Sequence, residues 1–169
     1  HPVLNSVEDV FAPSDVYAVR NLDEKKATVL LRGAVTKTLD PKSELVDGKK
    51  NEPMQALAWL REYSSPGGGK GQAFCTTMGA AVDLVSDDAR RIVVNASYHL
   101  TGLEVPKKAD VSFVDPFYPS FYGFVKNPDF FAGRNLKPED FALGKTPVAK
   151  DPPGSPKWPF REMLSLIHI

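Results

Sequence analysis

A single cysteine is the first residue in this sequence that suggests chemistry. Cys75 lies in "GKGQAFCTTMGA", residues 69–80, where a strand-like run meets a turn at Gly79. A thiol becomes a nucleophile when a neighbouring base or a lowered pKa supplies the thiolate. Alternation along the run places Cys75 inside the strand rather than at the turn. His99 lies in a predicted helix among apolar neighbours, which indicates an interior or boundary residue. We therefore expect a buried, inert thiol.

Other motifs have simple structural explanations. "GGGKG", residues 67–71, lacks the first glycine and the Ser/Thr of a phosphate-binding loop, and a strand follows it, so we expect a hairpin loop. The sequence contains no spaced Cys/His cluster that would predict a metal site. His168 lies in "LSLIHI", which resembles a translated sequencing adapter, so no structural or functional role is expected for it.

Asp83 is the strongest single candidate for a polar site. It lies between a predicted strand and a predicted helix, where α/β proteins often bind ligands. A turn residue without a ligand is the alternative for this position. Asp87 and Asp88 are explained by the solvated start of the helix, where carboxylates complement the helix dipole.

A second candidate is a group of three residues that alternate along one predicted strand. Trp59, Arg61 and Tyr63 share one strand face. Aromatic rings with an arginine stack on a sugar and hydrogen-bond to it. Packing of Trp59 in a core is the alternative.

Hydrophobic periodicity predicts the elements that position these residues. We expect strands over 15–20, 27–35, 56–63 and 72–78, a polar loop over 37–53 and a helix over 86–103. The strand over 27–35 is apolar enough for burial on both faces, and the last two strands form a hairpin. Ser86 is a natural N-cap and Gly102 a stop. The helix is expected to bury one face, made of Ala89, Ile92, Val93, Ala96, Leu100 and Leu103.

Composition excludes two classes of partner. The chain has 169 residues, with 42% apolar and 25% charged residues, which is ordinary for a globular domain. Lys plus Arg equal Asp plus Glu at 21 each, so there is no basic excess for nucleic acid. The sequence has no run of about 18 apolar residues, which is the length that would predict a membrane span.

The sequence divides into four parts by composition. Residues 1–109 form the main domain, residues 110–143 an extended arm rich in aromatics and prolines, residues 144–163 a Pro-rich linker, and residues 164–169 the adapter-like end. The chain begins at His1 without a signal-peptide pattern, which favours a processed chain or a fragment.

Several strings together resemble the ThuA-like, or trehalose-utilisation, family. They are "HPVLNSVEDVFAPSDVYAV", "NEPMQALAWLREY", the string from Gly71 to Leu103, and "ADVSFVDPFYPSFYGF" with the later "LKPEDFAL". The resemblance covers residues 1 to about 143. It implies a flavodoxin-like, three-layer α/β fold like that of class I glutamine amidotransferases, of which this chain would be the C-terminal half only. Without the other half, we expect a marginally stable, aggregation-prone chain.

The resemblance also implies that amidotransferase chemistry is absent. The catalytic histidine of amidotransferases follows the strand that corresponds to "QAFCTT", where this chain has Met78, Gly79 and Ala80. Cys75 stands where relatives often carry Thr or Tyr. Neither the thiol nor the base is therefore provided here.

The function implied is binding of a trehalose-like sugar or keto-sugar at the strand ends. The ligand would lie near Thr77, Gly79 and Asp83, with Arg61 orienting a hydroxyl or carboxylate and His1 lining the cleft. No catalytic residue is assigned, no metal or cofactor is expected, and related proteins are often exported. The alternative is a non-catalytic interaction module joined to an oxidoreductase or a haem-carrying partner, with the aromatic arm as its contact surface.

Overall fold

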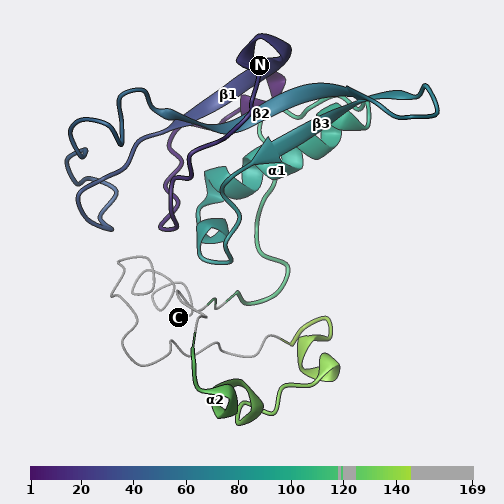
Figure 1. Ribbon diagram of the computed structural model, residues 1–169. Coiled ribbons are helices and arrows are strands. Elements are labelled where there is room, and N and C mark those ends of the chain that lie inside the picture. Colours follow the sequence, from purple (N-terminus) through teal and green to yellow (C-terminus); the bar gives the residue numbers. More distant parts are fainter. Residues whose placement is uncertain (118, 120–124, 146–169) are drawn as a thin grey trace. The chain divides into compact units, whose positions relative to one another are not determined.

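The computed structural model describes residues 1–117, 119 and 125–145, and the chain divides into two compact units, His1–Val111 and Ser112–Ile169. The first unit is a mixed α/β fold (Figure 1). Its elements are the short 3₁₀ turns η1 (Pro2–Leu4), η2 (Glu24–Lys26) and η3 (Asp83–Val85), the strands β1 (Ala27–Gly33), β2 (Gln55–Ser64) and β3 (Lys70–Thr76), and the helix α1 (Asp87–Leu100).

The three strands form one antiparallel sheet in the order β1-β2-β3. The predicted hairpin is confirmed, because Ser64 pairs with Lys70 and Ala58 with Thr76. Its connection is shorter than expected, since residues 65–69 close it with a hydrogen bond from Ser65 N to Gly69 O of 2.7 Å. Both β1 and β3 run antiparallel to β2, so they end at the same edge of the sheet.

Two strand predictions are wrong. Residues 15–20 form no strand. Ser14, just before them, is hydrogen-bonded to Asp83, and the Val16 side chain lies over Gly33. The strand predicted over 27–35 ends at Gly33 and is half-buried rather than buried on both faces. It is an outer strand of the sheet and pairs only with β2 among the described residues.

Helix α1 lies against one face of the sheet (Figure 1). The predicted N-cap is confirmed, since Ser86 Oγ accepts a hydrogen bond from Ala89 N. Gly102 follows the helix with a φ of +74°, as a C-terminal stop requires. Ile92 and Ala96 of α1 form the core with Leu60 of β2, Phe74 of β3 and Val3 of η1.

The buried face of α1 differs from the predicted one. Val93, Leu100 and Leu103 are exposed, whereas Arg91 and Asn95 are buried. The reason is the N-terminal segment, residues 1–10, which lies on this side of the helix and receives polar contacts there. Apolar spacing alone does not reveal such a partner.

The second unit contains the short helix α2 (Pro128–Ala132) and the 3₁₀ turn η4 (Pro138–Phe141). The arm over 110–143 was expected to lack regular structure, which is wrong for these two segments. Asn127 caps α2 by accepting a hydrogen bond from Asp129 N, and Pro128 occupies its first turn. The linker predicted over 144–163 lies outside the described residues except for Gly144 and Lys145.

Candidate functional site

Asp83 is fully buried and acts as the centre of a hydrogen-bond network. Its Oδ1 accepts from Ser14 N at 3.1 Å. Its Oδ2 accepts from Ser14 Oγ at 2.7 Å, and from Gly79 N and Ala80 N at 3.0 Å each. The side chain is 0% exposed, so it contacts no ligand directly. It instead ties segment 12–16 to the turn that follows β3.

A pocket of about 470 Å³ lies beside this network, at the edge where β1 and β3 end. We call it the strand-end pocket. Segments 9–16 and 33–39 form its walls, and the buried side chains of Leu57 and Met78 lie among its lining residues. Its volume lies in the usual range for small-molecule sites, which is roughly 300–1,000 Å³.

The strand-end pocket has two carboxylates without a partner among the described residues. Asp9 and Asp15 line it, and neither carboxylate forms an ion pair or hydrogen bond within the described part of the chain. Lys37 also lines it, but its Nζ lies 2.7 Å from Glu44 Oε2. Ionised carboxylates accept hydrogen bonds and donate none. The pocket therefore suits a ligand rich in hydroxyl donors that also has an apolar face.

The loop wall of the pocket is held by one buried amide. Asn51 Nδ2 donates to Val35 O at 2.9 Å and to Val46 O at 2.6 Å, and its Oδ1 accepts from Val35 N at 2.7 Å. The polar loop predicted over 37–53 is thus confirmed as irregular, apart from a single bridge between Thr36 and Leu45. Asn51 gives it an ordered end next to the pocket.

The structure brings together three of the five predicted site residues. Thr77, Gly79 and Asp83 all belong to the turn after β3. Thr77 N donates to Leu57 O at 3.0 Å, and Thr77 Oγ1 is buried without a partner in the described residues. These residues build one side of the strand-end pocket, next to Met78, and do not themselves line it.

His1 and Arg61 lie elsewhere. The His1 ring meets the His99 ring edge-to-face at 4.8 Å, and His99 Nε2 is hydrogen-bonded to Gln72 Oε1 at 2.9 Å. Gln72 is near the start of β3, whereas Thr77 follows its end. Arg61 is paired across the sheet with Ala73, in the middle of β3. His99 is half-buried, in agreement with a boundary residue.

Two further predictions about single residues need correction. Cys75 is half-buried rather than buried, because it lies on the sheet face opposite α1 and is paired with Trp59. Asp88 is not a solvated residue at the helix start. Its Oδ2 accepts from Glu8 N at 2.8 Å and Asp9 N at 2.9 Å, which holds the N-terminal segment beside the strand-end pocket.

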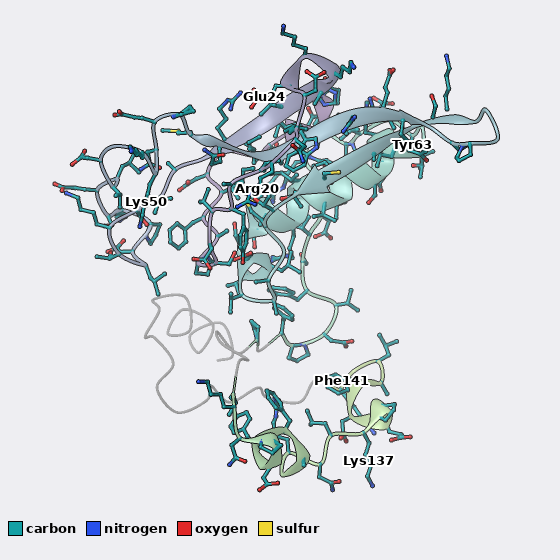
Figure 2. The ribbon with its side chains drawn as sticks, in the orientation of Figure 1. Arg20, Glu24, Lys50, Tyr63, Lys137 and Phe141 are labelled. Atoms are coloured by element: carbon teal, nitrogen blue, oxygen red, sulfur yellow. The ribbon has the colours of Figure 1, made fainter. Side chains whose placement is uncertain are left out.

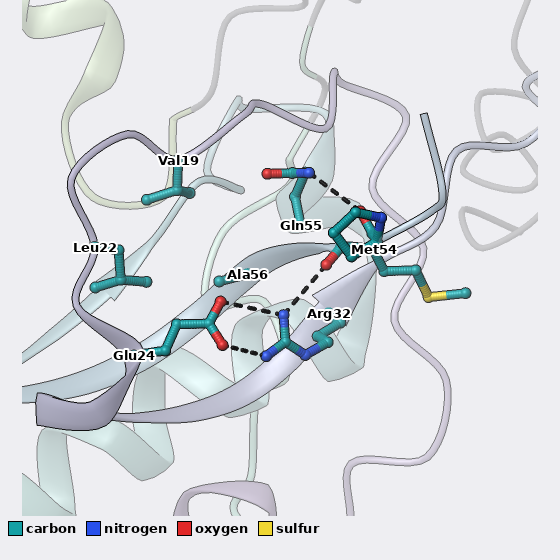
Figure 3. A pocket seen from close by; sticks show the side chains of 8 residues that line it. Val19, Leu22, Glu24, Arg32, Met54, Gln55 and Ala56 are labelled. Carbon is teal, nitrogen blue, oxygen red and sulfur yellow. Dashed lines mark hydrogen bonds and ion pairs between the residues drawn. The ribbon is translucent and has the colours of Figure 1, made fainter. Parts of the chain in front are cut away.

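A second, smaller hollow of about 360 Å³ contains a fork-to-fork ion pair (Figure 3). Both guanidinium Nη atoms of Arg32 donate to Glu24, and Nη1 also donates to Met54 O at 3.2 Å. The hydrogen bonds from Arg32 lower the pKa of Glu24, and the same contact raises the pKa of Arg32. Both groups are satisfied by each other, so this pair is a structural clamp rather than a site for ligand.

Sequence reasoning missed the two acceptors of the strand-end pocket, Asp9 and Asp15. The available signal was "FAPSD", residues 11–15, in which Pro13, Ser14 and Asp15 are turn formers. The alternation over 15–20 instead predicts a strand that begins at Asp15. No group of three or more His, Cys, Asp or Glu residues gathers as metal ligands within the described residues.

Comparisons with known proteins match no family model, no curated protein and no solved structure. The resemblance to the ThuA-like family therefore stays a prediction that rests on the quoted strings. In the described part of the chain, no helix has both the length and the apolar character that crossing a bilayer demands.

Proposed function

We propose that this domain binds a neutral sugar or polyol in the strand-end pocket, in carbohydrate metabolism of the trehalose or keto-sugar type. One observation carries the proposal: the carboxylates of Asp9 and Asp15 have no partner in the described chain and line a pocket that also contains the buried side chains Leu57 and Met78. Carboxylates accept hydrogen bonds from hydroxyls, and apolar side chains cover the C–H face of a sugar ring.

The proposal retains the strand-end location and changes the residues. Thr77, Gly79 and Asp83 position the pocket wall instead of touching the ligand, and Arg61 and His1 have no part in it. The flavodoxin-like, three-layer architecture, with this chain as its C-terminal half, belongs to the same proposal. Amidotransferase chemistry has no part in it, because the turn after β3 offers Met78, Gly79 and Ala80 in place of a base.

Titration calorimetry with trehalose and its 3-keto derivative tests the proposal. Loss of one charge-assisted hydrogen bond costs about 1.5–3 kcal/mol, so Asp15→Asn should weaken binding by roughly tenfold or more. Asp47→Asn is the matched control, because Asp47 is an exposed loop carboxylate that does not line the pocket. Equal affinities for the two variants, or no heat from either sugar, would remove the support for the proposal.

A second variant closes the strand-end pocket without changing charge. Ala12 lines the pocket and is half-buried, so Ala12→Trp should fill the space that a sugar occupies. Ala18→Trp adds the same ring at an exposed position outside the pocket. The account predicts lost binding for the first variant and unchanged binding for the second.

The interaction module remains the second proposal, because apolar side chains of the second unit are exposed. Phe141 is 60% exposed, Leu143 84% and Val114 87%. A titration without sugar binding, together with capture of a purified redox or haem-carrying partner that depends on Phe141, would favour this module.

A further inference from the structure

A row of three large side chains lies on the sheet face opposite α1. Trp59, Arg61 and Tyr63 alternate along β2, so they point to the same side. Their neighbours Leu60 of β2 and Phe74 of β3 point to the other side and pack in the core with α1. We call the three residues the β2 row.

The flanking strands carry smaller side chains beside this row. Cross-strand pairing sets each row residue next to a β3 residue, which is Cys75, Ala73 or Gly71. Trp59 and Arg61 are also paired with Val29 and Ala27 of β1. The row residues are therefore larger than the residues paired with them.

Tyr63 lies across the backbone of its partner strand. A Cβ added to Gly71 would lie 2.6 Å from Tyr63 Oη and 2.7 Å from Tyr63 Cζ, so the glycine leaves the space that the ring occupies. Tyr63 is nevertheless 55% exposed. Trp59, at the other end of the row, is half-buried. The row thus offers two aromatic rings that are held by the sheet and partly open to solvent.

Arg61, between the two rings, is exposed and has no hydrogen bond or ion pair within the described residues. It lines a hollow of about 480 Å³ together with Lys25 and Lys26. Glu62 lines the same hollow, and Lys26 Nζ lies 3.5 Å from Asp23 Oδ2. Leu60 and Gln72 also line this hollow, and both lie on the α1 side of the sheet, so the hollow is not part of the β2-row face. Arg61 itself supplies the positive charge between the two rings.

We propose that the β2 row binds an acidic oligosaccharide, a sugar chain that contains uronic acids. The negative faces of aromatic rings attract the C–H faces of sugar rings, and a guanidinium fork matches a carboxylate. Residues two apart on a strand are about 6.7 Å apart, so the row extends over roughly 13 Å, enough for more than one sugar unit. Arg61, without an ion pair among the described residues, supplies the charge complementarity.

A single-stranded nucleic acid is the competing ligand, because bases also stack on aromatic rings next to cations. It is disfavoured here, since a neutral chain lacks the extended basic track that follows a phosphate backbone. The β2 row shares no residue with the strand-end pocket, and its ligand is anionic rather than neutral. The two proposals therefore succeed or fail separately.

Fluorescence of Trp59 reports binding directly, in a Trp158→Phe background that removes the other tryptophan. The probe is a galacturonic acid oligomer at low salt. We expect a saturable change in emission, and Arg61→Gln should weaken the affinity by tenfold or more. Arg20→Gln is the control, because Arg20 is exposed, is outside the hollow and lies apart from Tyr63 (Figure 2). Added salt should weaken binding to the Arg61 protein more than to the Gln variant.

Gly71→Ala tests the aromatic part of the β2 row without removing a ring. The added Cβ displaces the Tyr63 ring, and the backbone tolerates alanine because this glycine has no positive φ. We expect Gly71→Ala to bind the acidic oligomer more weakly. Arg61→Gln should have an unchanged urea midpoint, so that its weaker binding does not come from unfolding. Equal affinities for Arg61→Gln and Arg20→Gln, equally tight binding of a neutral maltooligosaccharide, tighter binding of an oligonucleotide, or no saturable signal would each overturn the proposal.

Discussion

Replacing Asp83 should lower the free energy of unfolding of the chain, and not merely its affinity for a ligand. Asp83→Ala removes an acceptor of four hydrogen bonds from a position with no solvent exposure. Hydrogen bonds to charged groups are worth about 1.5–3 kcal/mol each, but they are not additive. Gly79 and Ala80 are exposed residues, so water can reach their amides after the carboxylate is lost. We therefore expect a loss of about 3–5 kcal/mol in the free energy of unfolding, which is less than the sum for four such bonds.

Urea unfolding followed by circular dichroism measures this loss, and Ser14 provides the internal check. Ser14→Ala removes only the hydroxyl that donates to Asp83 Oδ2 at 2.7 Å, so it should cost about 1.5–3 kcal/mol. In the Asp83→Ala background the same change should cost much less, because its partner is gone. Asp83→Asn should fall between the wild type and alanine, since one amide oxygen still accepts. An unchanged urea midpoint for Asp83→Ala, or additive costs in the double variant, would refute the network.

The remaining predictions concern the ends and edges of the sheet unit. Gly102→Ala should cost about 1–2 kcal/mol in urea unfolding, because its φ of +74° is left-handed, whereas Gly67→Ala, with open space and no positive φ, should cost much less. Asn95→Ala should cost about 2–3 kcal/mol, since two N-terminal carbonyls lose their donor at 3.1 and 3.0 Å. A change under half of that would contradict the role of Asn95 in holding the N-terminal segment. Because Arg32 lowers the pKa of Glu24 below 4.5 in the folded state, the pair stabilises the fold above that value and the contribution is lost as pH falls through the folded pKa. The urea midpoint of Glu24→Gln should therefore fall less on acidification than that of the wild type. The difference is small because the pair is exposed, and identical pH profiles for the two proteins would contradict the contribution of the pair.

The hairpin and the helix could be predicted from the sequence because local signals agree there. Period-two alternation, a glycine-rich connection and short separation define β2 and β3. Ser86 and Gly102 mark the helix ends by chemistry that needs no distant partner. The segments over 56–63 and 86–103 were accordingly placed to within a few residues.

Long-range polar contacts could not be predicted in the same way. Asn95 looks like an exposed helix residue until the carbonyls of Val3 and Asn5 are known to lie beside it. The hydrogen-bond network of Asp83 could not be predicted, because its donors include Ser14, far away in the sequence. Alternation over 15–20 failed because alternation does not show whether a segment pairs, and within the described residues this segment joins no sheet.

The most direct test of the central claim is to locate the neutral sugar by two-dimensional ¹H–¹⁵N NMR of the whole chain. The account predicts that trehalose or its 3-keto derivative shifts amide signals of residues 11–16 and 33–39 and of Met78, around the strand-end pocket. The signals of Ala27, Arg61 and Ala73, on the opposite part of the sheet, should stay in place. Shifts confined to those three residues, or no shifts with either sugar, would contradict sugar binding at the strand ends.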